Sequence, residues 1–349
     1  MVNKVQFYSI ILAGGIGERL WPYSTPDRPK QIIPFLNGES LLTQTINRCK
    51  LFSDKIFIIT SKEQQSLIAK AIDGLGCELL IEPTHRNTAP AIMYSLFEVQ
   101  KINPNAIVGF FPADHYIPDY DVFSYHIKKI QEYVSINYQI CLLGLTPKHP
   151  ATGYGYIEVV DETVEVKGFY SIKKFHEKPC LSVAEQYLKN ENKFWNLGIF
   201  IAEINSFIDE CKICAPEIFD KVFQYFQNKD EQLYEQVLNQ SIDYAVMEKS
   251  LNIVLHNVAF EWNDVGNLDV FMALKKEHGN FIDSNVIEIN SKNNLIDVKG
   301  KLVALIGVAD LCVVEQNEIL LISKRSDVEM VKGLHLVYKS KKESSETSD

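Results

Sequence analysis

The sequence lacks three features that would each place it in a special class of protein. It has no excess of positive charge, since 35 Lys and Arg face 45 Asp and Glu, and we therefore expect no binding to nucleic acid. Its seven cysteines are an odd, scattered set, and a chain of this length needs no disulfides, so a reducing compartment is expected. It contains no run of 18 or more apolar residues, which predicts a cytoplasmic protein without a membrane-spanning helix.

What is present is the composition of a folded, water-soluble protein. Hydrophobic residues make up 46% of the 349 positions and charged residues 23%, which excludes disordered, collagenous and coiled-coil chains. The length exceeds the ~150 residues of a typical domain. We therefore expect one large domain and a smaller one.

Short apolar runs alternate with stretches of helical periodicity over the first 150 residues. This alternation predicts parallel βαβ units, an α/β fold of Rossmann-like type with ligands at the carboxyl ends of the strands. The expected strands are Phe7 to Leu12, Lys55 to Thr60, Glu78 to Glu82, Ala106 to Phe111 and Ile140 to Leu145, and the expected helices are Leu41 to Lys50, Gln64 to Ile72, Ala89 to Lys101 and Val122 to Val134.

The pattern changes twice further along the chain. From about residue 150 the strands and helices alternate less regularly, which is consistent with a mixed sheet. After Gly279 short β-type runs follow Asn, Gly and Asp turns. We predict a large domain over 1–279, a small β-rich domain over 280–338 and a disordered tail over 339–349.

A glycine-rich turn follows the first expected strand. Leu12, Ala13, Gly14, Gly15 and Gly17 belong to it, and glycines at a strand end let backbone N–H groups approach phosphate oxygens. The turn is neither a Walker A loop, which needs a Lys followed by Ser or Thr, nor a dinucleotide fingerprint, whose last glycine is absent.

The segment after this turn carries positive charge back toward it. Three prolines between residues 22 and 29 exclude a continuous helix. An extended loop can then bring Arg28 and Lys30 near Arg19 and a polyphosphate. Solvated surface charges are the alternative, but the adjoining glycine turn favours phosphate binding.

At this point the chain resembles the sugar-nucleotide pyrophosphorylases, and within them the mannose-1-phosphate guanylyltransferases. The likeness extends over roughly residues 8 to 335. It is carried by motifs in order along the chain: Gly14 to Gln31 with its R-L-W-P and P-K-Q, Glu82-Pro83, Arg86 to Ala91, Pro112 to His115, Thr152 to Ile157, Phe175 to Pro179, Trp195-Asn196, Ser241 to Lys249, and Trp262 to Gly266.

The resemblance implies an enzyme that transfers GMP from GTP to mannose 1-phosphate with Mg2+, giving GDP-mannose and pyrophosphate. It implies that 1–279 is the catalytic nucleotidyltransferase domain with a mostly parallel mixed sheet, that 280–338 is β-helix-like, and that the protein is a homodimer. The implied catalytic residues are Arg19, Lys30, Asp114, Lys178 and Asp264; those for the nucleotide are Leu12, Ala13, Gly14, Gly15, Gly17, Glu82, Asn87 and Thr88; those for the sugar phosphate are Gly155, Glu177, Lys178 and Asn196; and those for the metal are Asp114 and Asp264.

The residue types listed above suit the transfer of GMP to a sugar phosphate. A sugar phosphate has a second pKa of about 6 and is already ionised, so no general base is required. The task is to neutralise charge and to position two polyanions. Asp114 ends an apolar strand and Asp264 lies on a turn, where carboxylates suit magnesium, although each could serve only as a cap or turn former.

The resemblance also suggests how the base is recognised. Glu82 follows the third expected strand, and its carboxylate can accept from both N1–H and the N2 amino group of guanine. Asn87 and Thr88 could cap the helix that begins near Ala89, and capping is compatible with ligand contact.

Three departures from the family pattern leave other functions open. Glu18 stands where the family commonly has Thr, Leu197 and Ile199 replace Ser and Met, and Glu261 replaces Gly. The alternatives are a guanylyltransferase for another sugar 1-phosphate, such as a heptose, an enzyme for another base, and a non-catalytic regulatory homologue that binds nucleotide sugars.

Overall fold

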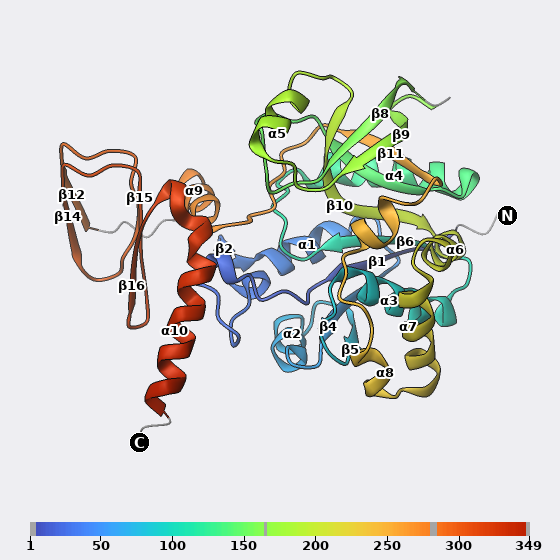
Figure 1. The fold of residues 1–349 in the computed structure, drawn as a ribbon, viewed down its shortest axis with the longest axis horizontal. Coiled ribbons are helices and arrows are strands. Elements are labelled where there is room, and N and C mark those ends of the chain that lie inside the picture. The colour runs from blue at the N-terminus through green and yellow to red at the C-terminus, as the bar shows by residue number, and fades with distance from the viewer. Residues whose placement is uncertain (1–4, 164–165, 280–284, 347–349) are drawn as a thin grey trace. The chain divides into compact units, whose positions relative to one another are not determined.

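The computed structural model describes residues 5–163, 166–279 and 285–346 (Figure 1). It divides into two compact units. The first unit consists of Met1–Gly14, Thr45–Ala113 and Ile117–Trp262, and the second of Gly15–Gln44, Asp114–Tyr116 and Asn263–Asp349. In the described parts of these ranges, no helix is long and apolar enough to cross a membrane.

The first unit is built on a nine-stranded sheet in the order β5-β4-β1-β6-β10-β7-β11-β9-β8. β5, β4, β1 and β6 are mutually parallel, so the parallel βαβ units predicted from the sequence are confirmed. The strands are β1 Phe7–Leu12, β4 Lys55–Ser61, β5 Glu78–Glu82, β6 Ile107–Pro112, β7 Ile140–Leu145, β8 Tyr156–Thr163, β9 Phe169–His176, β10 Lys193–Glu203 and β11 Ile253–Val258.

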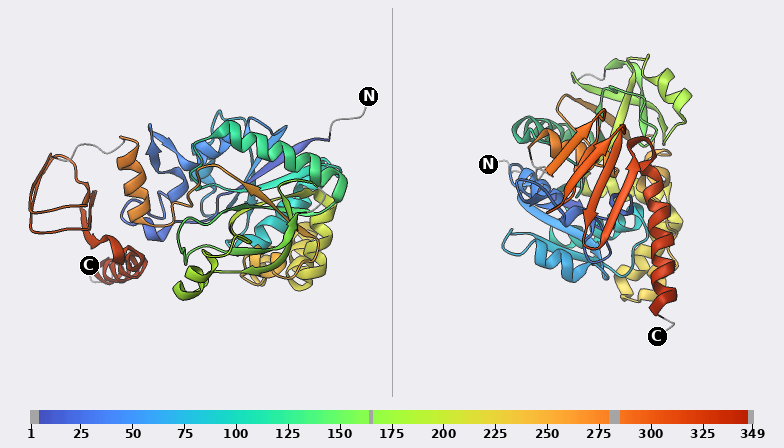
Figure 2. Two further views of the ribbon diagram at one scale, coloured as in Figure 1. Left: turned by 90° about the horizontal axis from the view of Figure 1, so that it is seen from above. Right: turned by 90° about the vertical axis from the view of Figure 1, so that its left-hand side faces the viewer.

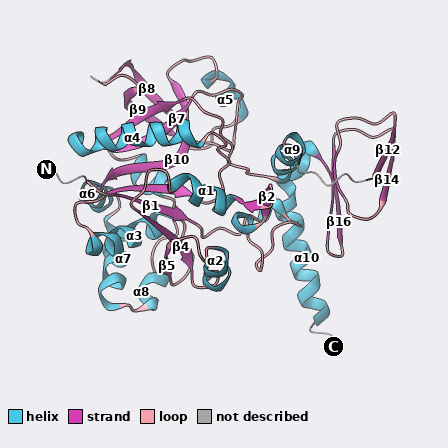
Figure 3. Cartoon of the chain, turned by 180° about the vertical axis from the view of Figure 1, so that it is seen from behind, coloured by secondary structure: helices cyan, strands magenta, loops and turns pink. Residues whose placement is uncertain are grey.

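Helices cover both faces of this sheet (Figure 3). Alternate residues of β1 point to opposite faces: Tyr8 packs in the cluster that includes α3, while Phe7 contacts Phe111, whose ring meets Phe123 of α4. Burial on both faces explains why these strands are continuous apolar runs. The helices are α1 Leu41–Cys49, α2 Gln65–Ala71, α3 Thr88–Ile102, α4 Tyr120–Asn137, α5 Leu181–Tyr187, α6 Ile204–Cys214, α7 Pro216–Asn228 and α8 Glu231–Glu235, with a π-helical turn η3 at Asp243–Met247.

The second half of the sheet is mixed, as the resemblance implied. β10 runs antiparallel to both β6 and β7, whereas β11 is parallel to β7. The register of β10 against β7 shifts between Asn196 and Phe200, at the positive-φ Gly198. Such an irregularity changes the direction of neighbouring side chains, and Asn196 is one of the predicted site residues.

The second unit contains a small β module after helix α9 (Leu268–Glu277), in which β12 pairs with β14 and β13 with β15 in parallel, while β16 is antiparallel to β15. Figure 2 shows its strands side by side. Residues 17 positions apart are paired: Asn285 with Leu302 and Leu295 with Cys312. A constant offset between parallel strands is that of successive coils of a β-helix, so the β-helix-like prediction is confirmed. Its strands are β12 Asn285–Ile289, β13 Leu295–Asp297, β14 Leu302–Ile306, β15 Leu311–Gln316 and β16 Ile319–Lys324.

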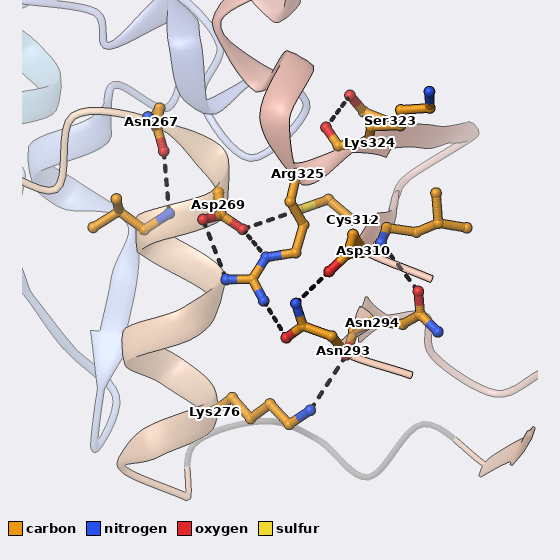
Figure 4. Close-up of polar contacts among 12 residues, drawn as sticks. Asn267, Asp269, Lys276, Asn293, Asn294, Asp310, Cys312, Ser323, Lys324 and Arg325 are labelled. Atoms are coloured by element: carbon orange, nitrogen blue, oxygen red, sulfur yellow. Dashed lines mark hydrogen bonds and ion pairs between the residues drawn. The ribbon is translucent and has the colours of Figure 1, made fainter. Parts of the chain in front are cut away.

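Polar contacts connect this module to α9. Arg325 Nη2 donates to Asp269 Oδ2 at 3.3 Å, and Arg325 Nη1 donates to Asn293 Oδ1 at 2.6 Å (Figure 4). Asn293 donates in turn to Asp310. These bonds join the helix, a turn of the β module and the start of the helical C-terminus within one unit.

The glycine-turn segment shares a core with this module. The Trp21 ring stacks on His335, Tyr23 donates to Asp297, and Leu20 lies in the same apolar cluster as Val328. Residues 15–44 also form the 3₁₀ turns η1 Glu18–Leu20 and η2 Lys30–Ile32 and the short strands β2 Pro34–Leu36 and β3 Glu39–Ser40.

The C-terminal end differs from the sequence-based expectation. A 3₁₀ segment, η4 Arg325–Met330, and helix α10, Val331–Glu346, follow β16. The β-rich part therefore ends at Lys324, and residues 339–346 of the expected disordered tail are helical. Polar composition predicted disorder, but Val331, His335 and Tyr338 anchor the helix on the apolar cluster and on Trp21. The last residues, 347–349, lie outside the described part.

Candidate functional site

The glycine-rich turn enters the second unit at Gly15, and from there it folds back on the loop that follows it. Gly17 has a φ of 77°, and a Cβ there would lie 2.3 Å from Lys30 Cβ. Ser24 Oγ donates to the Gly17 carbonyl at 2.6 Å, and Lys30 N donates to the Ile16 carbonyl at 3.0 Å. The predicted return of Lys30 to the turn is confirmed, whereas Arg28 is exposed and does not line the pocket described below.

Lys30 joins two of the predicted acidic residues. Its side chain is only 7% exposed, and its Nζ donates to Asp114 Oδ2 at 2.7 Å and to the Asp264 backbone carbonyl at 2.8 Å. A buried ammonium with two oxygen partners is held in one position. Residues from three separate parts of the sequence therefore meet at one point of the second unit.

These residues line a pocket of about 340 Å³. The second unit supplies every lining residue. Five of them were predicted as site residues; Lys332 was missed, because a single Lys among apolar residues belongs to no recognisable motif. The lining is Gly17, Glu18, Arg19, Leu20, Lys30, Asp114, His115, Asp264, Gly266 and Lys332.

The electrostatics of the pocket keep Asp114 ionised. Burial alone raises its pKa, but the Lys30 ammonium, followed by His115 and a hydrogen bond, outweighs it, and the pKa of Asp114 lies below its ordinary value. Asp264 Oδ1 accepts from Gly266 N at 3.0 Å, so it is also a turn former. In residues 5–163, 166–279 and 285–346 we find no group of three or more His, Cys, Asp or Glu placed to hold a metal without further ligands.

Glu82 lies in the first unit and is 1% exposed. Its Oε2 accepts from the Tyr234 hydroxyl at 2.7 Å, and its Oε1 lies 3.5 Å from His85 Nδ1. The hydrogen bond to Glu82 raises the pKa of His85. Gly14 lies against the same group, because a Cβ at this position would be 3.1 Å from His85 Nδ1. Sequence reasoning named Glu82 and Gly14 but missed Tyr234 and His85.

Asn87 is the N-cap of helix α3, and Thr88 is the first residue of the helix. Asn87 has a φ of 70°, and its side chain accepts from Thr88 N at 2.9 Å. Thr88 Oγ1 accepts from Ile242 N at 2.8 Å, so this hydroxyl also holds the segment before η3. The capping prediction is confirmed for Asn87 but not for Thr88, which is the first residue of the helix and whose hydroxyl accepts from Ile242 N instead. Contact with a ligand stays a prediction.

The predicted sugar-phosphate residues come together elsewhere in the first unit. A Cβ on Gly155 would lie 2.7 Å from Glu177 Oε2, and Glu177 Oε1 lies 2.8 Å from Lys178 Nζ. Asn196 N donates to the Gly155 carbonyl at 2.8 Å. The four residues are therefore one group, with Lys178, whose side chain is 57% exposed, at its outer side.

Asp243 is a further member of this group that sequence reasoning did not single out. Its Oδ1 accepts from Asn196 Nδ2 at 3.0 Å. Burial, followed by the charge of Glu177, raises the pKa of Asp243 to about 6. The only signal was its place in the S-I-D-Y-A-V-M-E-K motif, where the structure has the π-helical turn η3.

Two protein families match the chain. The family described as "Nucleotidyl transferase" matches residues 8–280, and "MannoseP isomerase/GMP-like beta-helix domain" matches residues 284–334. The second family covers the β module described above.

Individual proteins are similar over most of the chain. Mannose-1-phosphate guanylyltransferase 2 of Escherichia coli O157:H7 is 32% identical over 95% of this chain and 73% of its own length, and a mannose-1-phosphate guanylyltransferase of Escherichia coli is 30% identical over 97% and 77%. The crystal structure of a protein titled mannose-1-phosphate geranyltransferase from Thermus thermophilus has a TM-score of 0.86 at 25% identity, over 96% of this chain and all of that one.

Proposed function

This chain belongs to the nucleotidyl transferase family, and on that premise we propose that it transfers GMP from GTP to mannose 1-phosphate, giving GDP-mannose and pyrophosphate. The observation that carries the proposal is the meeting of Lys30, Asp114 and Asp264 at one pocket, in a chain whose relatives are named for this reaction over nearly its whole length.

The reaction is an in-line attack by an oxygen of the sugar phosphate on the α-phosphorus of GTP. The attacking oxygen is already ionised, and charge neutralisation is the main requirement. In the second unit, the N–H groups of Gly15 and Gly17 with Arg19 and Lys30 would bind the triphosphate. Asp114 holds the Lys30 ammonium in place, so Lys30 does not have to move when negative charge develops on the leaving pyrophosphate.

The first unit would supply recognition of the base and the sugar. Leu12, Ala13 and Gly14 end β1, and Glu82 would read guanine, with Asn87 and Thr88 at the start of α3. A guanine bound by Glu82 has to share the carboxylate with Tyr234. Lys178 would hold the sugar phosphate, while Gly155, Glu177 and Asn196 would contact the hexose.

The residues of the pocket fit Mg2+ as a metal that arrives with the substrate. Magnesium is commonly bound by one or two carboxylates together with substrate phosphates and water, and Asp114 and Asp264 both line the pocket. When bound there, Mg2+ would neutralise phosphate charge as a Lewis acid. The depressed pKa of Asp114 keeps that ligand ionised at neutral pH.

The sugar is tested by a panel of substrates. Leu197 and Ile199 are buried on either side of Gly198, and they replace the family's Ser and Met, so another sugar 1-phosphate is the alternative to test. Purified protein is mixed with each of GTP, ATP, CTP, UTP and dTTP and with mannose, glucose and heptose 1-phosphates, and pyrophosphate is detected. We expect release with GTP and mannose 1-phosphate. Release with a different pair would reassign the substrate, and none in a single turnover would favour a regulatory homologue.

We also propose that the protein is a cytoplasmic homodimer. Exposed apolar side chains on the β module support association, among them Leu302, Ile306, Leu320 and Ile322. Light scattering of the full chain should give twice the mass of 39.9 kDa, and a monomer at micromolar concentration would contradict it.

A further inference from the structure

A carboxylate in a phosphate-binding turn is unfavourable, and Glu18 is such a carboxylate. Its Oε2 lies 3.1 Å from the Nζ of Lys332, on the first turn of α10. The next residue, Arg19, has its Nε 3.4 Å from Glu329 Oε2, on η4. Two consecutive residues of the turn therefore pair with two residues, three positions apart, of the C-terminal helical segment.

These ion pairs contribute little to stability. The side chains of Glu18 and Lys332 are 26% and 56% exposed, and those of Arg19 and Glu329 are 51% and 59% exposed. Exposed ion pairs typically contribute between 0 and ~1 kcal/mol. The core formed by Trp21, Leu20 and their neighbours holds the segment in place. The pairing therefore needs another explanation.

The place of Lys332 supplies that explanation. Three cations, Arg19, Lys30 and Lys332, and three carboxylates, Glu18, Asp114 and Asp264, line the pocket. Of the carboxylates, Asp114 has Lys30 beside it, and Asp264 and Asp114 are the ones suited to a metal. Glu18 is the carboxylate with no role in the proposed reaction, and its charge opposes a polyphosphate. Among the described residues, Lys332 is the cation that forms an ion pair with Glu18.

We propose that Lys332 is a positioning residue of the phosphate pocket: its ammonium holds the Glu18 carboxylate and cancels its charge, so that the turn can accept a polyphosphate. The C-terminal helix thereby contributes to binding of the nucleotide. The identity of the polyphosphate, GTP or pyrophosphate, rests on the proposed function; the electrostatic coupling between Glu18 and Lys332 does not.

A double-mutant cycle tests this coupling. Lys332→Met, Glu18→Gln and the double variant are compared with the unchanged protein, and Lys341→Met, an exposed lysine further along α10, is the matched control. Pyrophosphate is the probe: its Kd is measured by calorimetry at low salt with and without Mg2+. The Michaelis constants for GTP and mannose 1-phosphate and the turnover number are measured in parallel. Circular dichroism melting checks that each variant is folded.

We expect Lys332→Met to weaken pyrophosphate binding by about tenfold, since an unpaired charge several ångströms from the phosphates acts through a partly aqueous medium. The Michaelis constant for GTP should rise similarly, with that for mannose 1-phosphate unchanged. In the Glu18→Gln background, Lys332→Met should weaken pyrophosphate binding by less than about twofold. The effect of Lys332→Met in the unchanged background should become smaller at high salt. Lys341→Met should behave as the unchanged protein.

Two results would overturn the proposal. An equal loss in both backgrounds would make Lys332 a direct phosphate ligand, and no loss in either would make the pair irrelevant to binding. Failure of the proposed function is distinguishable from both, because the unchanged protein would then release no pyrophosphate from GTP and mannose 1-phosphate while the coupling measured with pyrophosphate persisted.

Discussion

Asp243 provides a sharp test of the first unit, because its environment opposes ionisation. The side chain is partly buried, lies near Glu177 and accepts from Asn196. Burial, followed by the Glu177 charge, raises the pKa of Asp243 from 3.8 to about 6. Asp243→Asn keeps the side-chain oxygen that accepts from Asn196 but carries no charge at any pH. The comparison therefore isolates the cost of ionising this carboxyl in the folded protein.

The sign follows from proton binding. Between pH 3.8 and about 6 the folded protein retains the proton that the unfolded chain has released, so folding takes up a proton and the free energy of unfolding falls as pH rises. Each pH unit in this window costs ~1.4 kcal/mol. The window spans about two pH units, so the full penalty is about 3 kcal/mol, present above pH 6 and absent below pH 3.8.

Urea unfolding at a series of pH values from about 4 to about 8 measures this difference. We expect Asp243→Asn to gain about 3 kcal/mol over the unchanged protein across that range, whereas Asp220→Asn, at an exposed position of α7, should show no such trend. A difference between Asp243→Asn and the unchanged protein that stays constant with pH, or that falls as pH rises, would refute the reasoning.

Further predictions concern the proposed chemistry. Asp114→Asn should lower turnover by at least ~100-fold with the fold retained; near-normal turnover at saturating Mg2+ would exclude the ligand role. Lys178→Met should raise the Michaelis constant for the sugar phosphate far more than that for GTP, and the reverse would show that Lys178 serves the other substrate. Glu82→Gln should reduce selectivity for GTP over ATP by about 1–3 kcal/mol; an unchanged ratio would place base recognition elsewhere. Truncation after Gly279 should lower solubility, measured by sedimentation, because it uncovers Trp21; a soluble truncated protein of unchanged stability would contradict this.

The sequence predicted the first half of the sheet well for a physical reason. Strands buried on both faces are continuous apolar runs, and helices that cover them repeat their apolar residues at helical spacing. β1, β5 and β7 consequently begin and end where the sequence predicts. The π-helical turn η3 was missed, since one extra residue per turn is set by packing rather than by a local pattern.

Residues of the candidate site could be predicted from the sequence where they belong to a family motif. Lys30, Asp114 and Asp264 follow from family motifs, and the structure brings them together through two hydrogen bonds. The partners of Glu82 were not predictable: Tyr234 lies 152 positions further along the chain, and a pairing at that distance leaves no periodicity or spacing in a single sequence.

Glu18 is a second residue whose partner could not be predicted, and without that partner its carboxylate is unexplained in a phosphate-binding turn. Its partner, Lys332, lies in the apolar-rich stretch Val331 to Tyr338, which the sequence assigned to the β-rich domain, so sequence alone gave neither its helical structure nor its place. The structure orders that stretch by packing Val331 and His335 onto the core that contains Trp21. Apolar contacts of α10 thus fix the position of the Lys332 ammonium, and this ammonium in turn offsets the negative charge of Glu18. A change that loosens α10 without touching the pocket, such as His335→Ala, should therefore weaken binding of pyrophosphate more in the unchanged background than in Glu18→Gln. Equal weakening in the two backgrounds would show that the helix acts on the turn through packing alone.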